Sequence, residues 1–131
     1  MEKKTVLIVD DEMDMRLYLS TLLESHGYRP LTRRNGKDGL LSIREERPDL
    51  IILDIMMPGD GGVKMYSWLK SDAALTDIPV IMLSAVAASS FRHFLTMLNA
   101  QQTIAVPEPN AYLEKPVDHD QLIQLVRDTI G

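Results

Sequence analysis

The chain has 131 residues, enough for one domain with a buried core and too few for two ordinary domains. Its apolar share of 45% and charged share of 25% are typical of a soluble globular protein, and the absence of cysteine excludes disulfides and thiolate metal sites. A formal charge of −5 disfavours direct binding of nucleic acid, and the first apolar run is too short for a signal peptide or a membrane span, so we expect one cytoplasmic domain over residues 1–131.

The first half of the chain alternates short apolar runs with helical spacing. Residues 6–9 predict a buried strand, and an amphipathic helix follows in which Leu19, Leu22, Leu23 and His26 share one face. Gly27 is the expected C-terminal cap of that helix. A short strand is predicted at 28–31, and a helix at 36–46 should end ahead of Pro48, because a proline disfavours helical geometry in the residue before it.

The second half repeats the alternation. Strands are predicted at 50–53, 80–83 and 111–114, with a loop at 56–62 and a helix at 63–70 between the first two. The final helix should begin after Asp118, which forms a capping signature with Gln121. Strands separated by helices in this way require right-handed crossovers, so the sequence predicts a parallel α/β sheet with helices on both faces.

Polar residues follow four of the predicted strands, and in parallel α/β sheets ligands bind at that edge. These residues are Asp10, Asp11, Asp54, Ser84 and Lys115. Carboxylates that converge there repel one another unless a cation neutralises them, and oxygen ligands suit Mg²⁺ best, with Mn²⁺ as the alternative. A carboxylate beside such an ion can accept a phosphoryl group, whose oxygens Lys115 and Ser84 could hold.

Each of these residues also has an ordinary structural explanation when it is taken alone. The acidic residues at 10–12 could stabilise a helix N-terminus, and Asp54 could be a turn residue. Ser84 could cap a helix, and Lys115 could be a solvated surface lysine. Their joint placement at strand ends favours a site. The three histidines show no mutual ligand spacing, so we assign them no metal site.

The ordered set of motifs resembles the receiver domain of bacterial response regulators. The motifs are Asp10-Asp11, Leu53-Asp54-Ile55-Met56-Met57-Pro58-Gly59, Ser84-Ala85 and Lys115-Pro116. The resemblance covers nearly the whole chain. It implies a single doubly wound, five-stranded, flavodoxin-like sheet of strand order 2-1-3-4-5, and a cis bond between Lys115 and Pro116.

The resemblance also implies a role for each residue of the site. Asp54 would be the phosphoacceptor, and Ser84 and Lys115 would bind the phosphoryl oxygens. The metal would be held by Asp10, Asp11, Asp54 and the Met56 backbone carbonyl. Ser84 and Tyr112 would form the switch. The domain would then catalyse only its own phosphorylation and dephosphorylation. No other enzymatic activity and no nucleotide or other organic cofactor is expected.

The implied function is that of a receiver in two-component signalling, phosphorylated by a histidine kinase or a phosphotransfer protein. A phosphorylation-independent binding module and a phosphohydrolase with Asp54 as nucleophile are the alternatives, and no Asp-x-Asp pair begins at Asp54 to support the latter. We expect neither membrane nor direct nucleic-acid binding. A downstream protein, a fused output domain and an activation-linked dimer all stay open.

Three features depart from the family pattern. The chain between Ser84 and Lys115 is longer than usual, which predicts a longer or displaced fourth helix carrying Phe91, Phe94, Leu95 and Leu98, then a proline-rigidified connection. This puts the usual switch surface in doubt.

Gly39 replaces an alanine, at a cost of about 1 kcal/mol unless close packing requires glycine. Met56 and Val86, near the expected pocket, cannot orient a water molecule, so slow self-dephosphorylation is expected.

Overall fold

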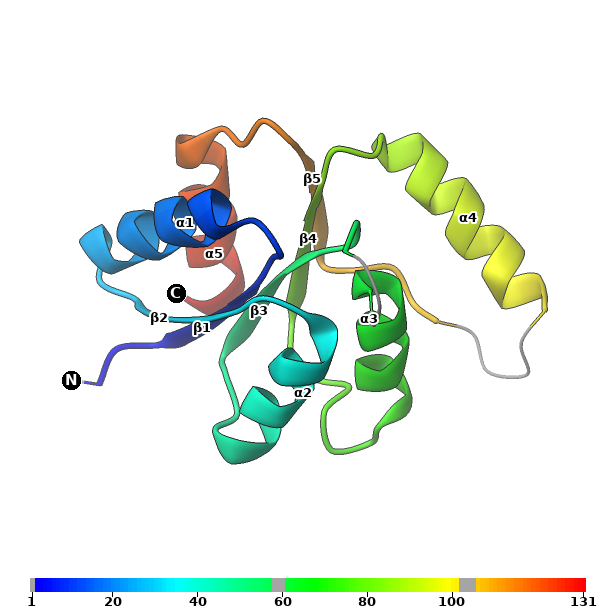
Figure 1. The fold of residues 1–131 in the computed structure, drawn as a ribbon, viewed down its shortest axis with the longest axis horizontal. Helices are drawn as coiled ribbons and strands as arrows, with labels where there is room; N and C mark the ends of the chain where they lie inside the picture. Colours follow the sequence, from blue (N-terminus) through cyan, green and yellow to red (C-terminus); the bar gives the residue numbers. More distant parts are fainter. Residues whose placement is uncertain (1, 58–60, 102–105) are drawn as a thin grey trace.

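Five parallel strands alternate with five helices along the chain (Figure 1). The computed structural model describes residues 2–57, 61–101 and 106–131. The elements are β1 (Thr5–Val9), α1 (Met13–Ser25), β2 (Arg29–Arg33), α2 (Gly36–Glu45), β3 (Leu50–Asp54), α3 (Gly62–Ser71), β4 (Val80–Ser84), α4 (Ala88–Ala100), β5 (Ala111–Glu114) and α5 (His119–Ile130).

The sheet has the strand order β2-β1-β3-β4-β5, all parallel. The three inner strands are buried along their whole length, which explains why their sequences are continuous apolar runs rather than alternating ones. The predicted doubly wound, flavodoxin-like sheet of order 2-1-3-4-5 is therefore confirmed.

The side chains of alternate strand residues feed two hydrophobic layers, one on each face of the sheet. One layer packs Val6 and Ile8 of β1 against α1 and α5, and the other packs Leu7 and Val9 against α2, α3 and α4. Figure 1 shows the same division, with α1 beside α5 and α2 beside α3. The helices thus cover both faces, as predicted, and leave the carboxyl edge of the strands accessible.

The helix ends follow the predicted local signals. Gly27 has a φ of +90°, which glycine adopts without steric cost, and the N–H of Tyr28 reaches back to the Leu23 carbonyl at 3.0 Å. The Asp118 carboxylate accepts the N–H of Gln121 at 3.0 Å and caps α5. Both predicted caps are confirmed.

Several predicted boundaries shift by one or two residues. β2 runs from Arg29 to Arg33 rather than over 28–31, and α2 ends at Glu45 rather than at 46. β2 is an edge strand whose residues are exposed or only partly buried, so no continuous apolar run marks its limits. Of the predicted loop at 56–62, residues 58–60 lie outside the described part of the chain, and α3 begins at Gly62.

Gly39 lies where the second helix packs closely on the sheet. A Cβ atom there would be 3.0 Å from the Met65 Cε atom and 3.1 Å from the Val9 Cγ2 atom. Close packing therefore accounts for the glycine.

The fourth helix is 13 residues long, compared with 10 for α2 and for α3. Its Phe91 and Leu95 are buried, whereas Phe94 is 47% exposed. After α4, Val106 is buried, and its N–H and carbonyl both bond to the Asn99 side chain at 2.7 and 2.9 Å. A helix is present over residues 91–98 as expected, while its length relative to the family stays a prediction. The connection that follows it is held to the helix by two hydrogen bonds.

Two further expectations concern the backbone and the membrane. The bond between Lys115 and Pro116 is cis, as the resemblance implied. Among the described helices, none is both long enough and apolar enough to cross a bilayer.

Candidate functional site

The same type of turn follows each of three neighbouring strands, β1, β3 and β4. The last residue of β3, Asp54, accepts the N–H of the residue two positions on, Met56, at 2.9 Å. Asp10, directly after β1, accepts from Glu12 at 2.9 Å, and Ser84, at the end of β4, accepts from Val86 at 3.1 Å. Such turns, in which a short polar side chain bonds the backbone two residues on, fix the rotamer of that side chain.

The turns leave the second oxygen of each carboxylate free for a shared partner. The Lys115 ammonium donates to Asp10 Oδ2 at 3.1 Å and to Asp54 Oδ2 at 3.3 Å. Lys115 follows β5, so residues from three strands meet at one edge of the sheet. The sequence prediction that Asp10, Asp54 and Lys115 come together is thus supported by direct contacts.

Burial sets the electrostatics of these groups. Asp10 is 1% and Asp54 is 3% exposed. Burial raises the pKa of Asp54 and the Asp10 carboxylate adds to the rise, while the Met56 N–H and Lys115 oppose it. Burial alone would lower the pKa of Lys115, but the hydrogen bond to Asp10 and the charges of Asp54 and Asp10 outweigh it, so this pKa is raised. Lys115 is therefore a firmly protonated counter-charge.

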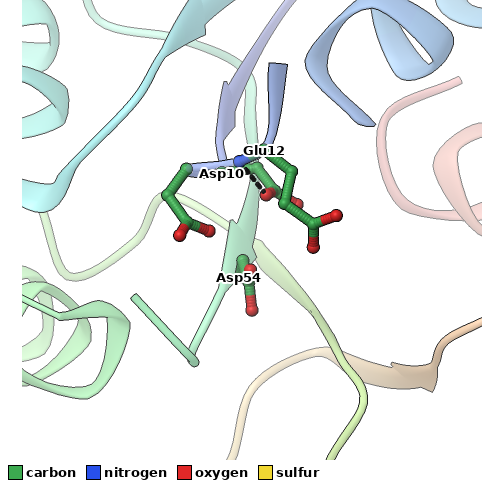
Figure 2. Close-up of side chains that lie close together, drawn as sticks. Asp10, Glu12 and Asp54 are labelled. Atoms are coloured by element: carbon green, nitrogen blue, oxygen red, sulfur yellow. Dashed lines mark hydrogen bonds between the residues drawn. The ribbon is translucent and has the colours of Figure 1, made fainter. Parts of the chain in front are cut away.

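Four carboxyl groups face one small space. Ligand atoms of Asp10, Asp11, Glu12 and Asp54 all lie within 4.8 Å of one another. Figure 2 shows the Asp10, Glu12 and Asp54 side chains close together. One lysine cannot balance so many carboxylates, and an all-oxygen donor set suits a hard divalent cation such as Mg²⁺. The residues present therefore fit the expected ion.

Glu12 was not among the predicted site residues. Its carboxylate receives a hydrogen bond from Lys115 at 3.3 Å, although its side chain is 61% exposed. The sequence shows a third acidic residue after β1, but in sequence it looks like an ordinary helix N-terminal acid. Only the tertiary position of Lys115 distinguishes it.

The predicted switch pair meets through a third residue. The Tyr112 hydroxyl donates to the Val86 carbonyl at 2.6 Å, and the Val86 N–H bonds the Ser84 hydroxyl. The Tyr112 ring also stacks on Phe91 of α4, with ring centroids 5.1 Å apart. Burial raises the pKa of Tyr112, which outweighs the opposing effect of the Ser84 hydroxyl. Ser84, Tyr112 and α4 therefore form one connected set.

Met56 is placed by its N–H bond to Asp54, and its side chain is 60% exposed. That bond does not test the ligand role of its carbonyl, which stays a prediction. The exposed thioether is a weak acceptor that cannot hold a water molecule as an amide or carboxylate can.

The doubly wound sheet and its acidic carboxyl edge define a flavodoxin-like α/β domain with a candidate metal site. The sequence model of the response regulator receiver domain matches residues 6–127, and the chain belongs to this family. Receiver domains bind Mg²⁺ at an acidic pocket and act as signal transducers in two-component and phosphorelay pathways.

Individual relatives agree with the family assignment. The chain is 34% identical to the polar-differentiation response regulator DivK of Brucella anthropi, over 100% of this chain and 98% of the relative. Among solved structures, chemotaxis protein CheY4 of Vibrio cholerae superposes with a TM-score of 0.82 at 22% identity, covering 98% of this chain and 99% of the other. The receiver domain of a histidine kinase from Syntrophus aciditrophicus has a TM-score of 0.81 at 29% identity, covering 97% and 89%.

Proposed function

We propose that Asp54 accepts a phosphoryl group in a Mg²⁺-dependent reaction, and that the donor is the phosphohistidine of a histidine kinase or phosphotransfer protein. The observation that supports this most is the orientation of the two buried carboxylates. In Asp10 and in Asp54, one carboxylate oxygen accepts a backbone N–H and the other accepts a hydrogen bond from Lys115. Asp54 therefore presents a fixed oxygen at an accessible sheet edge.

The proposed transfer balances without a further reactant. An oxygen of Asp54 forms a bond to phosphorus while the bond from phosphorus to the imidazole nitrogen breaks, and the electron pair stays on that nitrogen. Asp10, Asp11, Asp54 and the Met56 carbonyl would hold Mg²⁺, which supplies positive charge to the phosphoryl oxygens. Lys115, within hydrogen-bonding distance of Asp54, would supply a further positive charge to the phosphoryl oxygens.

The proposed switch runs from Ser84 to α4. If the Ser84 hydroxyl turns toward a phosphoryl oxygen, it gives up the Val86 N–H. The same residue holds Tyr112 through its carbonyl, and Tyr112 stacks on Phe91. Phosphorylation would therefore alter the contact between β5 and the N-terminal part of α4.

The test is the intact mass after incubation with acetyl phosphate. We expect an adduct of one phosphoryl group in the presence of Mg²⁺, and none with a chelator or in Asp54→Asn. Asp120→Asn is the matched control, because it removes the same charge at a side chain that is 93% exposed on α5. An unmodified wild-type protein, under conditions that label a control receiver, would favour a phosphorylation-independent binding module instead. An adduct on Asp54→Asn would place the acceptor elsewhere.

We also place the domain in the cytoplasm and expect no direct contact with nucleic acid or membrane, in accord with its charge of −5.

A further inference from the structure

A groove lies between α2 and α3, away from the proposed phosphorylation site. Its volume is about 780 Å³. Lys37, Leu41 and Arg44 line it from α2, Trp68 lines it from α3, and Asp72 lines it directly after α3. The two helices pack side by side on the same face of the sheet (Figure 1). None of these residues belongs to the acidic cluster or to the Tyr112 switch, so a role for this groove is independent of the proposed function.

The groove has an apolar centre. Leu41 is 49% exposed and Trp68 is 42% exposed, and both line the same hollow. Single exposed apolar side chains are common on soluble proteins, but a large aromatic ring and a leucine across one groove form a surface that can exclude water from a partner. Tryptophan is also strongly enriched among the residues that contribute most to binding.

Positive charge flanks this apolar centre. Lys37, Leu41 and Arg44 are spaced i, i+4 and i+7, which places one basic residue on either side of Leu41 along one helix face. Within the described ranges, neither Lys37 nor Arg44 forms an ion pair. The Lys64 ammonium lies 4.8 Å from the centre of the Trp68 ring.

One acidic residue, Asp72, also lines the groove, against the two basic residues Lys37 and Arg44. The Asp72 carboxylate accepts the N–H of Ala74 at 2.8 Å and closes the turn after α3. The groove is thus a basic and apolar surface on a chain whose formal charge is −5. A partner that complements it carries carboxylates on both sides of an apolar ridge.

We propose that the α2–α3 groove binds an acidic amphipathic helix of a partner protein. A helix laid in the furrow between two helices presents side chains at i, i+3, i+4 and i+7, which matches a groove with an apolar centre and charged margins. Leucines of the ligand would contact Leu41 and Trp68, and its glutamates would pair with Lys37 and Arg44. Two copies of this chain complement one another less well groove to groove, because each would present the same excess of basic over acidic residues.

The test uses the intrinsic fluorescence of the protein, since Trp68 is its single tryptophan. The probe is a synthetic peptide of about 15 residues, the length at which isolated helices begin to form. It carries leucines on one face and glutamates on the flanks. A second peptide has lysine in place of every glutamate. We expect saturable change of Trp68 emission with the acidic peptide, and affinity for the basic peptide weaker by about tenfold or more.

Variants then assign the binding to the groove. The double variant Lys37→Glu with Arg44→Glu should lower the affinity for the acidic peptide by about tenfold or more, and Leu41→Ser should lower this affinity as well. The matched control is Lys3→Glu with Arg127→Glu, which changes the net charge equally at a hollow near the chain ends. Circular dichroism checks that each variant stays folded.

Three results would overturn the proposal. The peptides could bind equally well, or the groove variant could lose no more affinity than the control variant. Emission could also change with protein concentration alone and not with peptide, which would assign the groove to a second copy of the chain.

Discussion

At the scale of single residues, Gly62 has the least space for a side chain among the described glycines. A Cβ atom at Gly62 would lie 2.1 Å from the backbone oxygen of Asp54 and 2.5 Å from the Cα atom of Ile55. Real Cβ atoms do not approach backbone so closely, and backbone cannot turn aside as a side chain can. Gly62, the first residue of α3, therefore packs directly against the backbone of Asp54, the proposed phosphoacceptor, and of Ile55.

Gly62→Ala should consequently displace α3 or the end of β3. We expect it to lower the free energy of unfolding by about 3 kcal/mol or more, the upper range for overpacking. Gly39→Ala is the matched substitution: its added methyl crowds side chains of Met65 and Val9 rather than backbone, and about 1 kcal/mol of helix propensity offsets part of that cost, so its loss should be much smaller than at Gly62. Urea denaturation of both variants measures this. Equal losses at the two positions would show that the approach to Asp54 is not specially restricted.

Met56 bears on the lifetime of the phosphorylated state. Its side chain is 60% exposed beside Asp54 and provides no strong hydrogen-bonding group for an attacking water molecule. We expect self-dephosphorylation over minutes or longer, and faster decay in Met56→Asn, whose amide can orient water. Following the adduct mass after removal of acetyl phosphate tests this. A wild-type lifetime of seconds would contradict the expectation.

At the scale of elements, the segment after α4 is held at two points. Asn99 makes two hydrogen bonds to the backbone of Val106, and the buried Tyr66 of α3 donates from its hydroxyl to the Pro107 carbonyl at 2.7 Å. The segment therefore connects α4 to α3 before the chain enters β5. A change at β5 can reach α4 both through the ring of Tyr112 and through this connection.

Asn99→Ala should release the first of these points. Losing two hydrogen bonds to a buried residue should lower the free energy of unfolding by about 1–3 kcal/mol. Hydrogen exchange should rise at the amides of Val106, Glu108 and Asn110 and in the last turn of α4, while β1 and β3 keep their protection. Thr96→Ala is a suitable control, because its hydroxyl bonds within α4 to the Arg92 carbonyl. The role assigned to Asn99 fails if exchange at the amides of Val106, Glu108 and Asn110 is unchanged. Protection confined to a much shorter helix would contradict the 13-residue length of α4.

The elements also show how far sequence reasoning reaches. The inner strands were predictable because burial on both faces makes each a continuous apolar run, and their terminal polar residues identified Asp10, Asp54 and Ser84. The limits of β2 were not predictable, because an edge strand lacks that run. Glu12 was missed because its significance lies in a contact with Lys115, 103 positions away. The Asn99 bonds were missed for a different reason: a polar side chain near a helix end can take many partners.

At the scale of the whole molecule, the carboxyl edge concentrates negative charge that the fold itself does not neutralise. Four carboxylates share the space with one lysine, and the raised pKa of Asp54 means that its ionised form is less favourable in the folded than in the unfolded chain. Stability should therefore depend on divalent cations.

Without metal, Asp54→Asn should be more stable than the wild type, because it removes one buried charge. Mg²⁺ should reverse that order: at 100 times its Kd, an ion that binds only the folded state adds about 2.7 kcal/mol, and the variant lacks one ligand. Thermal unfolding with a chelator and with Mg²⁺ measures both effects. The charge argument would be wrong if the variant were the less stable protein without metal, and Asp120→Asn again provides the control for charge.

The two chain ends lie close together. The Lys4 ammonium donates to the Ile130 carbonyl, and Tyr28 donates to the Gly131 carbonyl at 3.4 Å. Since β1 begins beside Lys4, these residues lie at the amino ends of the strands, opposite the carboxyl ends that carry Asp10 and Asp54. A protein attached to a surface through either terminus would therefore present its acidic edge outward. A short peptide could also join the two ends into a circular chain, which could then be reopened in a surface loop.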